Sequence, residues 1–233
     1  MSDKDLYASP FGAGYSAYME RPWLSRRISR VLWGGDTGPY YGLMEAARSV
    51  PAGGAVVDCP CGAGPALRAI PPGVAYVGVD LSAAMLGRAR KRAAARGVAG
   101  AEFVEADAEA TPLSTGLADL FLSFWGLHCF ADPAAALQEA ARVLKPGGRL
   151  VGSSFLRGHE TLRQRFLIRP GVGGFGPMGT HSEIESWLAD AGLELHVATR
   201  SGPFLFFDAS KPILAPGVSG GGGIRTHETP YDA

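Results

Sequence analysis

Neither sign of charge is in excess in this sequence. The 233 residues include 22 lysines and arginines and 22 aspartates and glutamates, so the formal net charge at pH 7 is zero. General binders of nucleic acid or of membranes usually carry a surplus of basic residues, because they must gather phosphate groups or anionic lipid. The balance therefore argues against nucleic acid as a partner and favours a small or weakly charged ligand.

Long apolar runs are also missing. No segment reaches the roughly 18 apolar residues of a membrane span, and residues 1–14 lack the basic and then apolar order of a secretory signal. We therefore expect no membrane span and a cytoplasmic location. The three cysteines, Cys59, Cys61 and Cys129, cannot all pair, and a single C-x-C without a second cluster falls short of a zinc site. Reduced thiols and no bound metal are expected.

The length and the 46% of hydrophobic residues suit one well-packed domain. We predict a helical N-terminal extension at 1–50, a main domain at 51–212 and a disordered, Gly-rich tail at 213–233. Within the main domain, the stretch 156–181 is polar and then Gly-rich, and it is long enough to form a lid or an acceptor-binding region. The assembly is expected to be a monomer or a homodimer.

Short apolar runs alternate with helical stretches along the main domain. Strands are predicted at 55–57, 75–79, 101–104, 117–124 and 149–155. Helices are predicted at 42–49, 65–70, 83–96, 133–143 and 182–191, the last with Ser182 as N-cap and Glu185 at the third helical position. This alternation implies βαβ units and a parallel sheet, and two later runs, 193–199 and 204–207, predict an antiparallel hairpin at its edge. The fold class is therefore α/β, doubly wound.

The most informative segment is residues 56–65, where a buried strand ends in Asp58 and leads through a turn containing Gly62 and Gly64 into a helix start. Ligands of open α/β sheets bind beyond the carboxyl ends of the strands, where glycine lets the backbone approach closely. A Gly-x-Gly turn alone is weak evidence, since glycine also serves ordinary tight turns.

Two further acids follow the next strands. Asp80 lies 18 residues after Gly62, where a carboxylate can bind both ribose hydroxyls; its alternative role is helix N-cap, which Ser82 could fill instead. Asp107 follows the third strand and could accept from an adenine amino group, or it could be a solvated turn residue. Acids after three successive strands favour a nucleotide-type cofactor.

S-adenosylmethionine (SAM) suits these acids better than a dinucleotide. A pyrophosphate beside Asp58 would add negative charge to an acidic, partly desolvated site. SAM instead carries an ammonium and a sulfonium cation, together with a carboxylate for loop N–H groups. The G-x-G-x-x-G spacing of dinucleotide sites also fails, because Gly64 is followed by Pro65-Ala66-Leu67.

Residues 56–155 resemble the class I SAM-dependent methyltransferases of the small-molecule type. Asp58 to Gly64 is similar to their first motif, D-x-G-C-G-x-G; Val79-Asp80-Leu81-Ser82 and Asp107-Ala108 look like the second and third, and 142–150 looks like the loop before the fifth strand. The resemblance implies a seven-stranded sheet ending in an antiparallel hairpin, and methyl transfer from SAM to a small-molecule acceptor. The cofactor residues it implies, with the neighbouring residues of the same segments, are Asp58, Pro60, Cys61, Gly62, Gly64, Asp80, Leu81, Met85, Asp107 and Ala108. Phe124 and Trp125, at the end of the fourth strand, could also line the cofactor or acceptor pocket, although aromatic residues at a strand end are commonly part of the core.

Pro60 departs from the family motif, which usually has glycine there. Proline fixes φ and removes one N–H donor, so cofactor binding survives only if that donor is not needed. A SAM-binding regulator or pseudo-enzyme without transfer activity is therefore one alternative function. An NAD-dependent oxidoreductase is another.

Methyl transfer needs mainly orientation and desolvation, with a general base only where the acceptor loses a proton. His128, just past the fourth strand, is the candidate base; the alternative is a histidine that only orients its loop. The acceptor-side candidates are Tyr15, Tyr18, Tyr40, Tyr41, His128 and Arg157. The acceptor atom, whether oxygen, nitrogen, sulfur or carbon, is left open.

Overall fold

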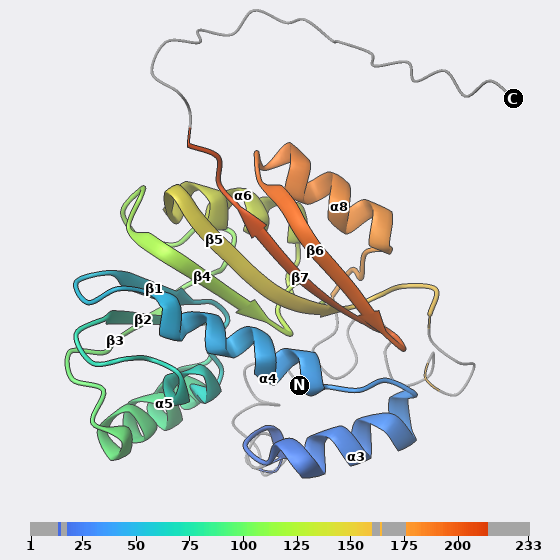
Figure 1. The fold of residues 1–233 in the computed structure, drawn as a ribbon, viewed down its shortest axis with the longest axis horizontal. Coiled ribbons are helices and arrows are strands. Elements are labelled where there is room, and N and C mark those ends of the chain that lie inside the picture. Colours follow the sequence, from blue (N-terminus) through green and yellow to red (C-terminus); the bar gives the residue numbers. More distant parts are fainter. Residues whose placement is uncertain (1–13, 15–17, 160–163, 165–175, 214–233) are drawn as a thin grey trace, which may run out of the picture.

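Seven strands form one sheet in the computed structural model of the protein, which describes residues 14, 18–159, 164 and 176–213. They are β1 (Ala55–Asp58), β2 (Ala75–Asp80), β3 (Glu102–Glu105), β4 (Ala118–Phe124), β5 (Leu144–Phe155), β6 (Glu194–Ser201) and β7 (Phe204–Ser210). The strand order is β3-β2-β1-β4-β5-β7-β6 (Figure 1). The first five strands pair in parallel and β7 pairs antiparallel with both β5 and β6. The predicted α/β class and the edge hairpin are confirmed.

Helices cover both faces of this sheet (Figure 1). The α-helices are α3 (Pro22–Trp33), α4 (Gly38–Met44), α5 (Ala83–Arg96), α6 (Pro133–Val143) and α8 (His181–Asp190); short 3₁₀ turns are η1 (Glu45–Ser49) and η2 (Pro65–Arg68). Helices α6 and α8 pack together on one face, against β4, β5 and β6. Helix α4 packs against β5 and β7 on the other face, where α5 lies beside β2 and β3.

The central strands are buried on both sides, which explains their continuous apolar sequence. Every residue of β1 is buried, and all of β4 except Asp119 is buried. Alternate residues face separate cores: Val57 and Phe121 pack in the core beneath α6 and α8, whereas Val56 and Leu122 pack in the core beneath α4. The residues at the carboxyl ends of these strands are therefore held by two cores at once.

Local start signals explain the helices, with three differences from the sequence prediction. Helices α5 and α6 have the predicted bounds and begin at the caps Ser82 and Asp132. Helix α8 begins earlier, at a capping box between Thr180 and Glu183, so the assignment of Ser182 and Glu185 was wrong. Threonine offers the same cap two residues upstream, and the helix begins after it.

The other two differences lie before and after β1. The predicted helix at 42–49 is divided into the end of α4 and the 3₁₀ turn η1. The predicted helix at 65–70 is only the single 3₁₀ turn η2. Tyr15, most of the predicted lid at 156–181 and the tail from residue 214 lie outside the described residues. Within the described residues, no helix is long and apolar enough to cross a membrane.

Gly152 in the central strand β5 provides a test of this packing. A Cβ added there would lie 2.3 Å from Phe207 Cζ and 2.7 Å from the Ser123 carbonyl oxygen, on the two flanking strands. We expect Gly152→Ala to lower the free energy of unfolding by ~1–3 kcal/mol, because neither neighbour can move without disturbing the sheet.

The matched control is Gly87→Ala in α5, where an added Cβ meets nothing within 4 Å. That substitution is expected to be neutral or to stabilise by about 0.5–1 kcal/mol, through helix propensity. Urea unfolding of both variants measures the difference. Equal stabilities would contradict the described packing of β5 against β7.

Candidate functional site

A cavity of about 200 Å³ opens at the carboxyl ends of β1, β2 and β4. All the predicted cofactor residues except Gly64 and Asp107 line it. The parallel registers explain this, since Asp58 at the end of β1 is paired with Gly78 of β2 and with Leu122 of β4. The topology therefore brings together side chains that are far apart in the sequence.

Asp58 is the buried acid of this cavity, with 2% of its surface exposed. The Tyr76 hydroxyl donates a hydrogen bond of 2.7 Å to Asp58 Oδ2. Burial raises the pKa of Asp58 to about 7, against the opposing effect of the Tyr76 hydrogen bond and with a smaller contribution from Asp80. The carboxyl group is therefore poised to ionise near neutral pH, and a nearby cation would favour its charged form.

Asp80 connects the loops that follow β1 and β2. Its Oδ2 accepts from the Gly62 N–H at 2.8 Å, and its Oδ1 accepts from the Ser82 N–H at 2.9 Å. Burial raises the pKa of Asp80, and these two backbone hydrogen bonds act in the opposite direction. Ser82 is the N-cap of α5, because its hydroxyl accepts from the Met85 N–H at 3.4 Å. The cap role is thus filled by Ser82, and Asp80 faces the cavity.

The two glycines of the first motif have different reasons to be glycine. Gly62 has φ +52° and lines the cavity, and a Cβ added there would meet nothing within 4 Å. Gly64 has φ +75°, but its added Cβ would lie 2.6 Å from Leu67 Cδ1 and 3.2 Å from Ala89 Cβ. Gly62 therefore keeps space open for a ligand, whereas Gly64 allows η2 and α5 to pack closely.

Backbone donors of this loop are largely used within the protein. The N–H groups of Cys59, Cys61 and Gly64 donate to Leu122 O, Val79 O and Cys61 O, at 2.8–2.9 Å. Pro60 follows a cis peptide bond and lines the cavity. In addition, η2 is a single 3₁₀ turn and too short to present a helix N-terminus to a carboxylate. The carboxylate needs a different partner.

The adenine-side candidates divide into two groups. Leu81, Met85 and Ala108 line the cavity, and 46% of the Leu81 surface is exposed although it is a large apolar residue. Asp107 is exposed, and its Oδ1 accepts from the Glu109 N–H at 3.1 Å within its own turn. Asp107 thus has the role of an exposed turn residue, which was the alternative to hydrogen bonding with adenine.

Aromatic rings form part of the cavity wall. The Tyr40 ring lies 5.0 Å from Phe124 and 5.8 Å from Trp125, between ring centroids, and all three residues line the cavity. Trp125 adopts φ +57°, which is unusual for a bulky residue. Its indole Nε1 is buried and has no hydrogen-bond partner among the described residues. Strain and an unpaired donor at one residue are typical of functional sites.

His128 is buried beside this wall and does not line the cavity. Its Nδ1 accepts from the Phe155 N–H at 3.2 Å, and its carbonyl oxygen accepts from the Gly176 N–H at 2.7 Å. Burial lowers the pKa of His128 to about 3. The imidazole is therefore neutral at physiological pH and connects β4 to β5, as in the orienting role that the sequence analysis kept open.

Of the remaining acceptor-side candidates, Tyr40 lines the cavity, whereas Tyr18, Tyr41 and Arg157 do not, and Tyr15 lies outside the described residues. The Tyr18 hydroxyl lies 2.7 Å from Ser29 Oγ, and the Tyr41 hydroxyl donates to the Met19 carbonyl at 2.9 Å. Arg157 forms an exposed ion pair with Glu183 at 2.6 Å.

Several lining residues were not predicted from the sequence: Met19, Ala66, Arg92, Ala106, Cys129 and Phe130 are among them. Arg92 on α5 has the clearest chemical meaning, because it is the cationic side chain of the lining formed by the described residues. It contacts the Ala63 carbonyl and forms an ion pair with Glu20. Arg92 lies within α5, ten residues after the cap Ser82, and no motif at that position could have identified it.

Tyr76 was also missed, although a signal was present. A tyrosine within a buried strand needs a hydrogen-bond partner for its hydroxyl, and Asp58 ends the neighbouring strand. Together these two residues set the charge at the base of the cavity.

The seven-stranded sheet with its terminal hairpin, and an acidic cavity at the carboxyl ends of its central strands, define the class I SAM-dependent methyltransferase fold. Residues 57–152 match the family model described as a methyltransferase domain. Over these residues the chain is similar to the class I SAM-dependent methyltransferases, whose cofactor is SAM.

Curated relatives and solved structures agree with this family. The chain is 46% identical over 84 residues to a demethylmenaquinone methyltransferase of Thermus thermophilus, covering 36% of this chain and 38% of the relative. It is 35% identical over 154 residues to the ubiquinone/menaquinone biosynthesis C-methyltransferase UbiE of Geobacter sulfurreducens, covering 61% and 59%. The chain thus spans less than two thirds of either relative.

A solved structure of a Haloferax volcanii methyltransferase, in complex with the activator Trm112, superposes with a TM-score of 0.70. It is 20% identical, and the match covers 91% of this chain and 99% of that one. At this identity the likeness concerns the fold.

The buried Asp58 predicts a pH-dependent cost to stability. Its pKa is about 7 in the folded protein and near 3.8 in an unfolded chain, so between these values the folded state holds a proton that the unfolded state releases. Stability is therefore lost as pH rises from about 4 to 7. We expect Asp58→Asn to gain stability relative to the wild type over this range, by roughly 1–4 kcal/mol at pH 7.5.

Thermal unfolding at several pH values measures this difference. Asp190→Asn, at the exposed end of α8, is the control and is expected to show no such trend. A stability difference for Asp58→Asn that stays constant between about pH 4 and 7.5 would show that the carboxyl is not held protonated.

Proposed function

We propose that the protein transfers the methyl group of SAM to a small, largely apolar acceptor molecule. The observation that carries this proposal is the distribution of charge in one cavity. Asp58 and Asp80 lie on its acidic side, Arg92 supplies a cation, and aromatic and aliphatic residues form much of the rest. SAM has the complementary pattern, with a cationic sulfonium, an ammonium, a carboxylate and a flat adenine.

Each group of SAM has a candidate partner among these residues. The charged form of Asp58 would attract the cationic methionine end, and Asp80 would bind the ribose hydroxyls. Leu81 and Met85 would pack on the adenine. Arg92 would bind the carboxylate, since the backbone donors of the loop are used within the protein. Because these partners do not include the missing N–H of Pro60, the departure from the family motif is compatible with binding.

SAM supplies an electrophilic methyl group that an acceptor atom attacks in line. The contribution of the protein is to orient the acceptor and exclude water. The rings of Tyr40, Phe124 and Trp125 are suited to both tasks, because their apolar faces shield the cavity from solvent and attract cationic groups. Phe130 and Cys129 extend the lining on the side of the β4 loop. An apolar acceptor fits this wall.

The names of the relatives are consistent with an apolar acceptor, since two of them refer to menaquinone or ubiquinone biosynthesis. We propose that the acceptor is a small molecule with an apolar body, because the cavity lining is largely apolar. Residues 51–212 would form the catalytic domain and the N-terminal extension its cover, because Met19 and Tyr40 come from that extension.

We assign His128 the role of a positioning residue. Its low pKa and its hydrogen bond from Phe155 support a neutral imidazole that fixes the β4 loop, on which Trp125 and Cys129 lie. A base would need contact with the acceptor, and His128 does not line the cavity.

The two alternatives predict different binding. A regulator without transfer activity would bind SAM and leave every acceptor unmethylated. An NAD-dependent oxidoreductase would bind NADH and not SAM, but the glycine spacing and the buried acid at Asp58 oppose a pyrophosphate.

Calorimetric titration with SAM and S-adenosylhomocysteine tests the cofactor site. We expect Asp80→Asn and Asp80→Ala to weaken binding by a factor of about ten or more, corresponding to ~1.4 kcal/mol. The asparagine variant keeps an acceptor oxygen for the Gly62 N–H, and it thereby separates loss of the ribose contact from collapse of the loop.

The control for this titration is Glu102→Ala, an exposed acid at the start of β3. It should bind like the wild type. Unchanged affinity in both Asp80 variants, or the absence of heat with either ligand, would contradict the proposed site, and NADH would then be titrated.

The pH profile of methyl transfer tests His128. An acceptor is first identified by screening. Across about pH 6–7, the rates of the wild type and of His128→Asn should then depend on pH in the same way, because the wild-type imidazole is already neutral there. The variant should lower the rate at all pH values alike, because asparagine can still accept from the Phe155 N–H but does not replace the packing of the imidazole ring against Trp125 and Phe155. A wild-type titration near pH 6.5 that His128→Asn abolishes would instead establish a general base.

A further inference from the structure

Helix α3 buries two serines and the half-buried Trp33 against the protein, and it exposes other large apolar side chains. Its fully buried residues are Ser25 and Ser29, whereas Trp23, Val31 and Leu32 are 65%, 84% and 60% exposed. A surface helix normally turns its apolar residues toward the core. The exposure of Trp23, Val31 and Leu32 requires an explanation, because exposing large apolar side chains costs free energy.

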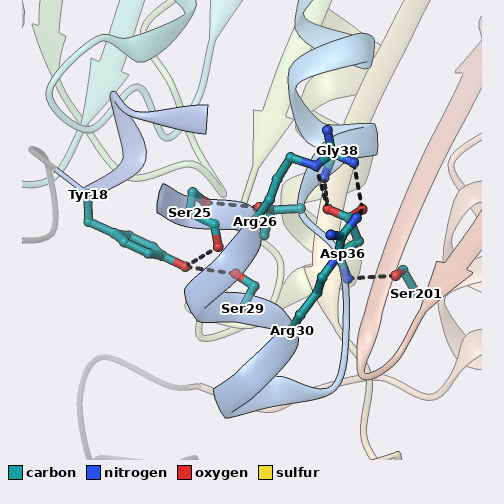
Figure 2. Close-up of polar contacts among 9 residues, drawn as sticks. Tyr18, Ser25, Arg26, Ser29, Arg30, Asp36, Gly38 and Ser201 are labelled. Atoms are coloured by element: carbon teal, nitrogen blue, oxygen red, sulfur yellow. Dashed lines mark hydrogen bonds and ion pairs between the residues drawn. The ribbon is translucent and has the colours of Figure 1, made fainter. Parts of the chain in front are cut away.

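Polar contacts hold α3 in this orientation (Figure 2). Ser25 Oγ lies 2.9 Å from Thr37 Oγ1, and Ser29 Oγ lies 2.7 Å from the Tyr18 hydroxyl. Asp36 accepts hydrogen bonds from Arg26 and from Arg30, at 2.6–3.0 Å.

Asp36 also fixes the chain that follows the helix. Its carboxylate accepts from the Gly38 N–H at 2.8 Å, and its own N–H donates to Ser201 Oγ at 2.8 Å (Figure 2). The helix is therefore tied to Asp36 by ion pairs, and Asp36 is hydrogen-bonded to the edge hairpin, while Trp23, Val31 and Leu32 face outward.

The exposed surface combines apolar and cationic groups. Trp23, Arg27 and Val31 are spaced four residues apart, so they lie along one stripe of the helix, and Leu32 lies beside it. The segment 21–36 contains four arginines against the single acid Asp36, although the whole chain is neutral. Arg27 is exposed, and within the described part of the chain it forms no ion pair.

We propose that α3, with Trp23, Arg27, Val31 and Leu32 as its outward surface, docks on the surface of an anionic lipid bilayer. Helices that lie at a membrane interface carry tryptophan and aliphatic residues beside arginine or lysine, as this surface does. An acidic soluble protein would match the arginines but would not explain the isolated, highly exposed aliphatic pair. The proposal does not depend on methyl transfer.

The position of α3 gives this surface a purpose. Met19, just before the helix, and Tyr40, shortly after it, both line the cavity. Figure 1 shows α3 at the periphery of the molecule, beyond α4. Docking through α3 brings the wall of the cavity close to the bilayer, where an apolar acceptor would be concentrated.

Vesicle flotation of the full chain tests the proposal. Vesicles of phosphatidylcholine alone are compared with vesicles of phosphatidylcholine and phosphatidylglycerol in equal parts. We expect the wild type to float only with the anionic vesicles, and to be released by added salt. The double variant Val31→Ser/Leu32→Ser and the variant Arg27→Glu should each reduce the bound fraction about fivefold or more.

Matched controls are Val197→Ser, a half-exposed valine on β6, and Lys91→Glu, an exposed cation on α5. Both should float like the wild type. Circular dichroism and thermal unfolding show whether each variant is folded. Quenching of tryptophan fluorescence by brominated lipid should be lost in Trp23→Phe and retained in Trp187→Phe.

Three outcomes would overturn the proposal. The wild type could remain unbound with both vesicle types. The α3 variants, being folded, could float as well as the wild type. Sedimentation could reveal a dimer that Val31→Ser/Leu32→Ser dissociates, which would assign the surface to a second copy of this chain.

Discussion

The burial of Asp58 is the constraint on which the rest of the site depends. Its strand lies in the middle of the sheet, between two hydrophobic cores, so its carboxyl group is almost fully buried at the cavity and accepts a hydrogen bond from Tyr76. The fold supports this unfavourable position because the strands on either side are almost entirely apolar. Burying this carboxyl group lowers the stability of the fold, but it leaves a group that can ionise beside a cation at neutral pH.

The aromatic wall is the counterpart of this acid. Trp125 packs against Phe155, Phe204 and Phe206 from the two neighbouring strands and against Tyr40 from the N-terminal extension. The unusual backbone of Trp125 is maintained by this surrounding packing. The cavity thus has one polar side from β1 and β2, and one aromatic side built by β4 and its neighbours.

Much of the fold could be predicted from the sequence, because its signals are local. The strands of the parallel core are continuous apolar runs, and α5 and α6 carry clear caps at Ser82 and Asp132. Asp58 and Asp80 were found because they follow strands directly. Thr180 was missed because Ser182 is an equally good local cap, and only the tertiary position of α8 decides between them.

Residues whose role depends on three-dimensional neighbours could not be predicted in the same way. Arg92 lies on a helix rich in arginine, and nothing local marks it as the one that reaches the cavity. Asp107 follows its strand as Asp80 does, yet a hydrogen bond within its own turn holds it outside. The polar anchor of α3 likewise joins Asp36 to Ser201, 165 residues later in the chain.

The bridge that Asp80 forms between the Gly62 and Ser82 N–H groups makes one mechanical unit of two loops. A displacement of the first loop must be transmitted to the cap of α5, and the reverse holds as well. Perturbations on the two sides of this carboxylate are therefore energetically coupled, and their effects should not add. The two parts of the cavity that the loops after β1 and β2 build would consequently respond to each other through a single side chain.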